Sequence, residues 1–301
     1  MDKKTPIIMH INYCEQGQTL DEICLKAVAW GFDGVEFRQK RGGVKETAEE
    51  YLDALARAQK RSGLKMVIFG SPGPDLMTPD AAKRAREVEE VSNFYRMAAR
   101  RFKLTVCNTF TGPLKNPDAA VPYYIYEKQG SAVATPDQWK WAVEGYKVLG
   151  ALAAELGFRF AFETHMTYLH DLPAVAKKLV DRIGCPSVGV NLDYGNTVYF
   201  PKPPSLKEVI GQVGPSLYYV HLKNCQISDG HERARVGLAD GDINHREYLR
   251  LLAEAGYRGP LCIEAPRPGD REWFAKQDIA YLKSLIADLA KPVGSKKPRA
   301  K

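Results

Sequence analysis

The chain has 301 residues, of which 45% are hydrophobic, so it can supply the core of one large domain or two small ones. Its formal net charge of +7 is unevenly distributed. Residues 291–301 carry five basic side chains and no acid, which leaves a net charge of only +2 for residues 1–290. A nearly neutral body lacks the basic surface that nucleic acid requires, so we expect no nucleic-acid partner and a basic disordered tail over 291–301.

The cysteines and the apolar runs indicate the compartment. The six cysteines show no C-x-x-C spacing, and four lie inside or beside apolar runs, as buried free thiols do. No stretch approaches the roughly 18 apolar residues of a membrane span, and the first apolar run is too short for a signal peptide. We therefore expect a cytoplasmic protein without a membrane partner.

Strand-like and helical segments alternate eight times along the chain. The first four units place strands over 7–12, 33–37, 65–69 and 104–108 and helices over 20–30, 46–61, 78–101 and 136–156. The last four place strands over 158–163, 188–193, 217–222 and 260–264 and helices over 172–183, 205–213, 245–255 and 270–290. Eight such units predict a (β/α)₈ TIM barrel in one domain over residues 1–290, with a doubly wound sheet as the alternative.

One segment interrupts this alternation. Residues 111–134 contain three prolines and the aromatic cluster Tyr123–Tyr126. We expect a βα-loop insertion over the barrel mouth. The tyrosines would form either a lid that stacks on a sugar ring or the interface of a homo-oligomer, and the sequence favours neither.

Four potential metal ligands each end a strand-like run: Glu163, Asp193, His221 and Glu264. In a parallel barrel the C-terminal strand ends converge on one face, where active sites are built. Three converging carboxylates would repel each other unless a cation lay among them. An oxygen-rich set with one imidazole suits one divalent ion, with Mn²⁺ as the first choice and Mg²⁺, Co²⁺ or Zn²⁺ as alternatives.

Several motifs carry a resemblance to a known family. They are Gly-Phe-Asp-Gly-Val-Glu-Phe at 31–37, Phe-Glu-Thr-His at 162–165, Asn-Leu-Asp-Tyr-Gly-Asn at 191–196, His-Leu-Lys-Asn at 221–224, Gly-Asp-Ile-Asn-His at 241–245 and the run 255–264 that ends in Glu264. Together they resemble the xylose isomerase-like TIM barrel superfamily of sugar phosphate isomerases and epimerases. The resemblance implies that the four residues above bind one metal, and that Glu163 and Glu264 also form the catalytic acid–base pair.

The chemistry of such a site has three outcomes. A metal that polarises a carbonyl and its adjacent hydroxyl stabilises an enediolate after a carboxylate removes the α-proton. Returning the proton isomerises or epimerises the sugar, whereas losing a β-hydroxyl dehydrates it. We therefore predict a metal-dependent isomerase or epimerase acting on a sugar, keto-sugar or cyclitol. The alternative is a lyase, such as an inosose or dehydroshikimate dehydratase or a 3-keto-C-glycoside deglycosidase, and a non-catalytic sugar-binding barrel comes after it.

Two positions depart from the epimerase pattern. Asn196 replaces the histidine of the family's Asp-x-x-His motif, and Ile227 replaces an arginine six residues after the metal histidine. Both changes remove a charged substrate contact, so they weigh against simple ketose epimerisation and toward the lyases. The absence of a phosphate-cradling glycine motif favours a free sugar or cyclitol over a sugar phosphate.

Further side chains at strand ends and in nearby loops are candidates for contact with the substrate. His165 lies two residues after Glu163, on the same side of an extended strand, and could act as a base, or it could merely pack at the barrel rim. The expected substrate contacts are His10, Glu36, Asn196, Lys223, His231 and Arg267. For the charged members the alternative is an ordinary salt bridge or a surface loop charge.

The segment Asp229–Glu232 resembles part of the endonuclease IV branch of the same superfamily, which uses three zinc ions. A trinuclear cluster needs additional histidines at the third, fourth and sixth strand ends. Those places hold 70–72, 108–110 and Asn196, and the chain has only six histidines. The sequence therefore makes a nuclease the least favoured function.

Overall fold

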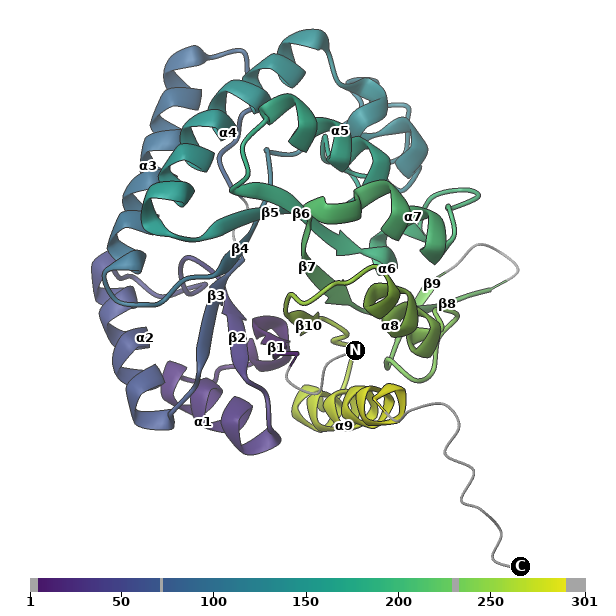
Figure 1. The fold of residues 1–301 in the computed structure, drawn as a ribbon. Coiled ribbons are helices and arrows are strands. Elements are labelled where there is room, and N and C mark those ends of the chain that lie inside the picture. The colour runs from purple at the N-terminus through teal and green to yellow at the C-terminus, as the bar shows by residue number, and fades with distance from the viewer. Residues whose placement is uncertain (1–4, 71–72, 229–232, 291–301) are drawn as a thin grey trace, which may run out of the picture.

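The computed structural model describes residues 5–70, 73–228 and 233–290, so His231 and the predicted tail lie outside the described residues. Eight parallel strands form a central barrel surrounded by helices (Figure 1). The strands are β1 (Ile7–His10), β2 (Gly34–Phe37), β3 (Met66–Phe69), β4 (Val106–Thr109), β5 (Arg159–Glu163), β6 (Val188–Asp193), β7 (Leu217–Leu222) and β10 (Leu261–Ile263). The principal helices are α1 (Leu20–Trp30), α2 (Ala48–Ser62), α3 (Ala81–Ala99), α4 (Pro136–Leu156), α5 (Pro173–Ile183), α7 (Leu206–Val213), α8 (His245–Glu254) and α9 (Arg271–Leu289). The predicted (β/α)₈ barrel is confirmed.

Strand order fixes which strand ends are neighbours. The sheet runs β3-β2-β1-β10-β7-β6-β5-β4, and an isolated parallel bridge between Gly70 and Asn108 joins its two edges, so the barrel is nearly closed. The registers place His10 beside Glu36 and Asp193 beside His221. The order β10-β7-β6-β5 therefore brings the ends of the four ligand-bearing segments into one arc.

The barrel interior changes from apolar to polar along its axis. An inner cluster of Ile8, Ile68, Val106, Ala161, Tyr219 and Cys262 fills its lower part. Side chains two residues apart on a strand point to the same face. The residue two positions after each member of this inner cluster therefore also points inward, and it lies nearer the C-terminal mouth. On β5 and β7 those next residues are Glu163 and His221, and Glu264 follows Cys262 in the same way. The strands thus present polar groups at the mouth above a packed core.

Helix limits follow from capping residues. Thr19, Thr47, Thr135 and Ser205 each form a capping box with the residue three positions later. Each box satisfies backbone N–H groups that the first helical turn leaves unpaired, which typically contributes about 1 kcal/mol. The predicted helix over 46–61 therefore begins at Ala48, because Thr47 is its N-cap, and the helix predicted over 78–101 begins at Ala81 after Asp80.

Four features of the loops go beyond the prediction. The segment after β7 contains the antiparallel hairpin of β8 (Asn224–Ile227) and β9 (Arg233–Val236), for which the sequence predicts no strands. A short helix, α6 (Tyr194–Thr197), directly follows β6, and β1 ends at His10 because 11–14 forms a 3-10 helix. The insertion over 111–134 contains two short 3-10 helices, η2 (Tyr126–Lys128) and η3 (Gly130–Val133).

Across the described ranges, no helix is long and apolar enough to cross a membrane.

Candidate metal centre and substrate cleft

The four predicted ligands converge at the C-terminal mouth of the barrel. Glu163, Asp193, His221 and Glu264 each offer a ligand atom, and these atoms all lie within 4.8 Å of one another. His221 Nδ1 lies 2.9 Å from Glu264 Oε2, 3.5 Å from Glu163 Oε2 and 3.9 Å from Asp193 Oδ2. The first three side chains are buried and that of Glu264 is 17% exposed, so the cluster is most accessible to solvent on the side of Glu264.

The donor set fits one divalent cation. Asp193 Oδ2 is buried, and among the described residues its close partner is the ammonium of Lys223, 2.6 Å away, rather than a backbone or neutral donor. Lys223 also lies 3.2 Å from Glu264 Oε2. In the metal-free protein the neighbouring carboxylates of Glu36 and Glu163 outweigh burial and raise the pKa of His221 well above its ordinary value. A cation would displace the Nδ1 proton, and with His221 neutral the three ionised carboxylates and one ammonium leave a formal charge of −2, which matches one divalent ion.

Protonation of Asp193 reflects this crowding. Burial raises the pKa of Asp193 to about 7, the neighbouring carboxylates add to the rise, and Lys223 and His221 oppose it. A carboxyl in this state gives up its proton when a cation joins the cluster, because the cation stabilises the ionised form.

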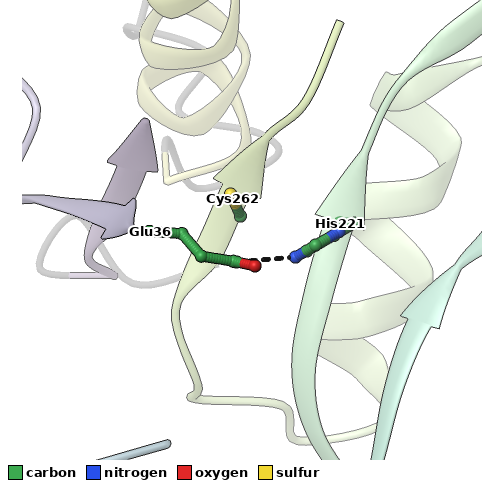
Figure 2. Close-up of side chains that lie close together, drawn as sticks. All are labelled: Glu36, His221 and Cys262. Atoms are coloured by element: carbon green, nitrogen blue, oxygen red, sulfur yellow. Dashed lines mark hydrogen bonds and ion pairs between the residues drawn. The ribbon is translucent and has the colours of Figure 1, made fainter. Parts of the chain in front are cut away.

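Glu36 binds one ring nitrogen of His221, as the dashed line in Figure 2 shows, while the other ring nitrogen faces Glu163, Asp193 and Glu264. Its Oε2 accepts hydrogen bonds from His221 Nε2 at 2.8 Å and from the Tyr219 hydroxyl at 2.7 Å. Burial alone would raise the pKa of Glu36, but the charge and hydrogen bond of His221 and the other donors outweigh it and lower the pKa to about 2. An ionised Glu36 keeps the proton on Nε2 and leaves Nδ1 to face the cluster, which is how metal-binding histidines are commonly oriented.

A second potential ligand group shares His221 with the first. Glu36, His221 and Cys262 also have ligand atoms within 4.8 Å of one another (Figure 2). Burial raises the pKa of the Cys262 thiol to about 12, so the sulfur stays protonated at neutral pH. Since a metal binds thiolate rather than thiol, and Glu36 already accepts hydrogen bonds, the four-residue set is the better candidate metal centre.

Two asparagines hold Glu163 in place. Asn108 donates to Glu163 Oε2 at 2.7 Å and to Glu36 Oε1 at 3.3 Å. Asn196 donates to Glu163 Oε1 at 3.0 Å, and its backbone N–H donates to Asp193 Oδ1. The role that the structure gives Asn196 is to position Glu163, and the predicted contact with the substrate stays a prediction. Asn108 was missed by sequence reasoning, although its place at the end of a predicted strand was an available signal.

The other predicted contacts at the mouth lie near the cluster. His10 Nε2 is 3.9 Å from Glu36 Oε1 and from Glu264 Oε1. Asn12, not predicted, donates to Glu264 Oε1 at 3.3 Å. His165 Nδ1 lies 2.8 Å from the carbonyl oxygen of Met166, so Nδ1 carries the proton in the neutral ring and Nε2 is the basic nitrogen. His165 is thus compatible with the predicted role as a base.

The structure does not bring Arg267 to the cluster. Its guanidinium donates to Asp278 Oδ2 at 2.8 Å and to the carbonyl oxygen of Ala265, and it stacks on Phe274 with 4.0 Å between the guanidinium carbon and the ring centre. Tyr13 donates to the same carboxylate at 2.7 Å. Arg267 therefore links the segment after β10 to Asp278 of α9. The guanidinium charge is already paired in a partly buried position, so the structure does not support the predicted contact of Arg267 with the substrate.

Two cavities open above the cluster. The smaller has a volume of about 310 Å³ and is lined by Tyr123, Tyr126, Tyr199, Lys223 and Glu264 among others. The larger, of about 820 Å³, is lined by Glu36, Asn108, Glu163 and Glu264 among others. Tyr126 packs against Tyr199 with 6.0 Å between ring centres, so the insertion forms one wall of the smaller cavity. This position fits the predicted lid, and the alternative of an oligomer interface stays a prediction.

The fold and site define a class: a (β/α)₈ barrel with a carboxylate–histidine cluster at its C-terminal mouth. A family model described as xylose isomerase-like TIM barrel matches residues 24–285, and the chain belongs to this family. The resemblance inferred from the motifs is thereby confirmed.

Individual proteins are similar to this chain either in sequence or in three-dimensional structure. An inosose dehydratase from Clostridium perfringens is 28% identical over 150 residues, which cover 45% of this chain and 50% of the relative. The chain thus matches about half the length of this curated relative. A xylose isomerase-like barrel protein from Mycobacterium smegmatis, solved in complex with magnesium, superposes with a TM-score of 0.73 at 18% identity over 95% of this chain and 97% of its own. The 3-keto-D-glucoside 4-epimerase from E. coli superposes with a TM-score of 0.71 at 17% identity over 93% and 100%. At these identities the two structures show the shared fold.

Proposed function

We propose that this chain is a divalent-metal-dependent isomerase or epimerase of a sugar, keto-sugar or cyclitol, and that it removes a proton from the carbon beside a carbonyl. The observation that carries the proposal is the meeting of Glu163, Asp193, His221 and Glu264 below an open cleft. A scaffold barrel has no need for three converging carboxylates, since their repulsion destabilises the fold unless it is compensated.

The proposed metal would be held by these four residues, with Mn²⁺ as the first choice and Mg²⁺, Co²⁺ or Zn²⁺ as alternatives. When bound, it would supply Lewis-acid polarisation of the carbonyl and its neighbouring hydroxyl. The remaining chemistry belongs to the protein. Glu163 and Glu264 are the candidate proton carriers, and Lys223, which lines the smaller cavity, can hold an oxygen on which negative charge develops.

The topology favours proton transfer from two sides. Glu163 ends β5 and Glu264 follows β10, and these strands flank β6 and β7 in the sheet. The two carboxylates therefore approach the cleft from opposite ends of the four-strand arc. One can remove a proton from a carbon between them and the other can return a proton, which would invert that carbon. His165, at the edge of both cavities, is a further candidate base.

A dehydratase is the second candidate. The sequence similarity to inosose dehydratases supports it, as does Asn196 in place of the family's second histidine. The same proton abstraction would then be followed by loss of a hydroxyl group from the next carbon. A product lighter by one water molecule, detected by mass spectrometry, would move the assignment from epimerase to lyase.

Solvent deuterium exchange tests the proposal. We expect Mn²⁺-loaded protein in D₂O to exchange one carbon-bound proton beside the carbonyl in a ketose or an inosose. Glu264→Gln and Glu163→Gln should lower the rate by roughly 10²–10⁴-fold, as loss of a general acid–base group does. Glu89→Gln, at an exposed position of α3, is the matched control and should exchange normally. Failure of the metal-loaded protein to exchange any compound would overturn the proposed function.

A further inference from the structure

The cleft above the proposed metal ligands has two arms. We name the cavity of about 310 Å³ the small arm and that of about 820 Å³ the large arm. Among the described residues, His165 and Glu264 are the two that line both. Glu163 lines the large arm as well. The reacting carbons, which must reach both glutamates, therefore lie where the arms meet, and a substrate there can extend in two directions.

Volume sets the size of the substrate. Small-molecule sites typically measure about 300–1,000 Å³, and each arm alone falls within that range. One sugar ring at the junction and in the small arm would leave the large arm filled with water. A site of this size is used fully by a substrate that carries a second group into the large arm.

Aromatic rings line the inner end of the large arm. The rings of Phe110 and Tyr168 lie 4.7 Å apart, and that of His165 lies 5.3 Å from Tyr168. Phe94 of α3 and Tyr51 of α2 also line this arm, although most of each ring is buried in the core. Such surfaces pack against the flat faces of sugar or aryl rings.

The charge of the large arm excludes an anionic second group. Apart from Glu36 and the proposed metal ligands Glu163 and Glu264, its lining includes the acids Glu46, Glu87 and Glu90 and the basic side chains Arg38 and Lys40. Glu46 is paired with Arg41, which leaves Glu87 and Glu90 as the acids that set the charge of the arm. Arg38 is paired with Glu15 at 2.5 Å. A phosphate or carboxylate placed there would meet net repulsion, so the arm selects a neutral group.

We propose that the substrate is a neutral two-ring keto-sugar, with its carbonyl ring at the metal ligands and its second ring in the large arm. This inference rests on the proposed function. A glycosidic link to the second ring makes the anomeric carbon an acetal, so the carbonyl must be a ring ketone. As a glutamate takes the proton from the adjacent ring carbon, the C–H electron pair moves toward the carbonyl oxygen. A proton then returns to that carbon, and the step needs no oxidant.

Matched substrates test the size and charge of the second group. The probes are 3-keto-D-glucose, 3-ketocellobiose and 3-keto-D-glucose 6-phosphate, each incubated with Mn²⁺-loaded full-length protein in D₂O. We expect kcat/KM for exchange to be roughly tenfold or more higher for the two-ring compound than for the single ring, because the second ring adds binding energy. The phosphate should be the poorest substrate. Equal values for one and two rings, or a preference for the phosphate, would overturn the inference.

Variants that fill the large arm provide the second readout. Gly42 lines this arm, and a Cβ there would meet no atom within 4 Å, so the backbone has room for a side chain and Gly42→Trp adds bulk at the wall of the arm. Ala48→Trp, on the same wall, is a second variant. Both should raise KM for 3-ketocellobiose and leave 3-keto-D-glucose unchanged. Gly211→Trp on α7, outside both arms and equally open, is the control.

The outcomes separate this inference from the function on which it rests. If Gly42→Trp and Ala48→Trp leave exchange of 3-ketocellobiose unchanged, the large arm does not bind the second ring, and the inference is wrong while the proposed function stands. If metal-loaded protein exchanges none of the compounds, nor any ketose or inosose, the proposed function fails and the inference fails with it.

Discussion

The orientation of His221 depends on a residue that does not belong to the four-ligand cluster. Glu36 accepts a hydrogen bond from Nε2, and Tyr219 and Asn108 donate to the Glu36 carboxylate in turn. The carboxylate is 1% exposed, so solvent does not weaken these bonds. Glu36 was predicted from its strand end to contact the substrate, and that role stays a prediction. The hydrogen bonds give it a second role, which is to direct Nδ1 toward the metal site.

We expect Glu36→Gln to lower Mn²⁺ affinity by about 10–100-fold, the usual effect of removing such a partner. Calorimetric titration measures the affinity, and the ¹⁵N shifts of His221 report which ring nitrogen carries the proton. Glu90→Gln, which changes an acid of the large arm farther along the wall, should bind Mn²⁺ as the wild type does. Wild-type affinity and unchanged ¹⁵N shifts in Glu36→Gln would show that Glu36 does not orient the ligand.

Lys223 competes with the metal for the same oxygen atoms. Its ammonium lies 2.6 Å from Asp193 Oδ2 and 3.2 Å from Glu264 Oε2. Lys223→Met removes this positive charge while keeping most of the volume, so we expect Mn²⁺ affinity to rise by roughly tenfold. Lys26→Met, which removes a lysine paired with Glu272 elsewhere, is the control. Weaker binding in Lys223→Met would mean that the lysine holds the carboxylates in place rather than competing with the ion.

The strand ends of this site were predictable, whereas much of the loop structure was not. Glu163, Asp193, His221 and Glu264 could be found because a polar residue directly after a buried strand has few packing reasons to be there. The hairpin of β8 and β9 was not predicted, because neither strand alternates between buried and exposed residues. In β8 two buried residues are followed by two exposed ones, and in β9 every residue is half-buried or exposed. Partners such as Tyr219 depend on register across the barrel, which local sequence does not reveal.

The insertion that forms the wall of the small arm is anchored by a buried acid. Asp171 Oδ2 accepts the backbone N–H of Ser131 at 2.9 Å, at the start of η3. Burial raises the pKa of Asp171 to about 6 from an ordinary value of 3.8, because the charged form is poorly solvated there. The folded protein thus favours protonated Asp171. The stability that protonated Asp171 contributes relative to the unfolded chain is fully present below its unfolded pKa of 3.8 and is lost as the pH rises through about 6.

Asp171→Asn keeps an acceptor for Ser131 and cannot ionise. Relative to this variant, the metal-free wild type should lose about 2 kcal/mol of unfolding free energy between about pH 4 and pH 7, in line with the change in pKa. Urea unfolding of both proteins at the two pH values measures the difference. A stability gap that is the same at both pH values would contradict this account of the insertion.

At the scale of the whole molecule, the barrel assembles a site from segments far apart in sequence. The ligands span residues 163–264, yet the order β10-β7-β6-β5 makes their strands consecutive neighbours. Alternation of strands and helices was enough to predict this convergence, because parallel strands place all their C-terminal ends on one face. The two arms could not be predicted, since their walls come from loops and helices whose positions depend on packing across the whole barrel.

Titration of the metal-free protein with Mn²⁺, followed by calorimetry, tests the central claim most directly. The account predicts one ion per chain for the wild type and loss of binding in Asp193→Asn, which removes a ligand charge while nearly preserving its shape. Asp171→Asn, which changes a buried acid outside the cluster, should still bind one ion. Binding of no ion by the wild type, or of one ion equally well by Asp193→Asn, would contradict the proposed metal centre.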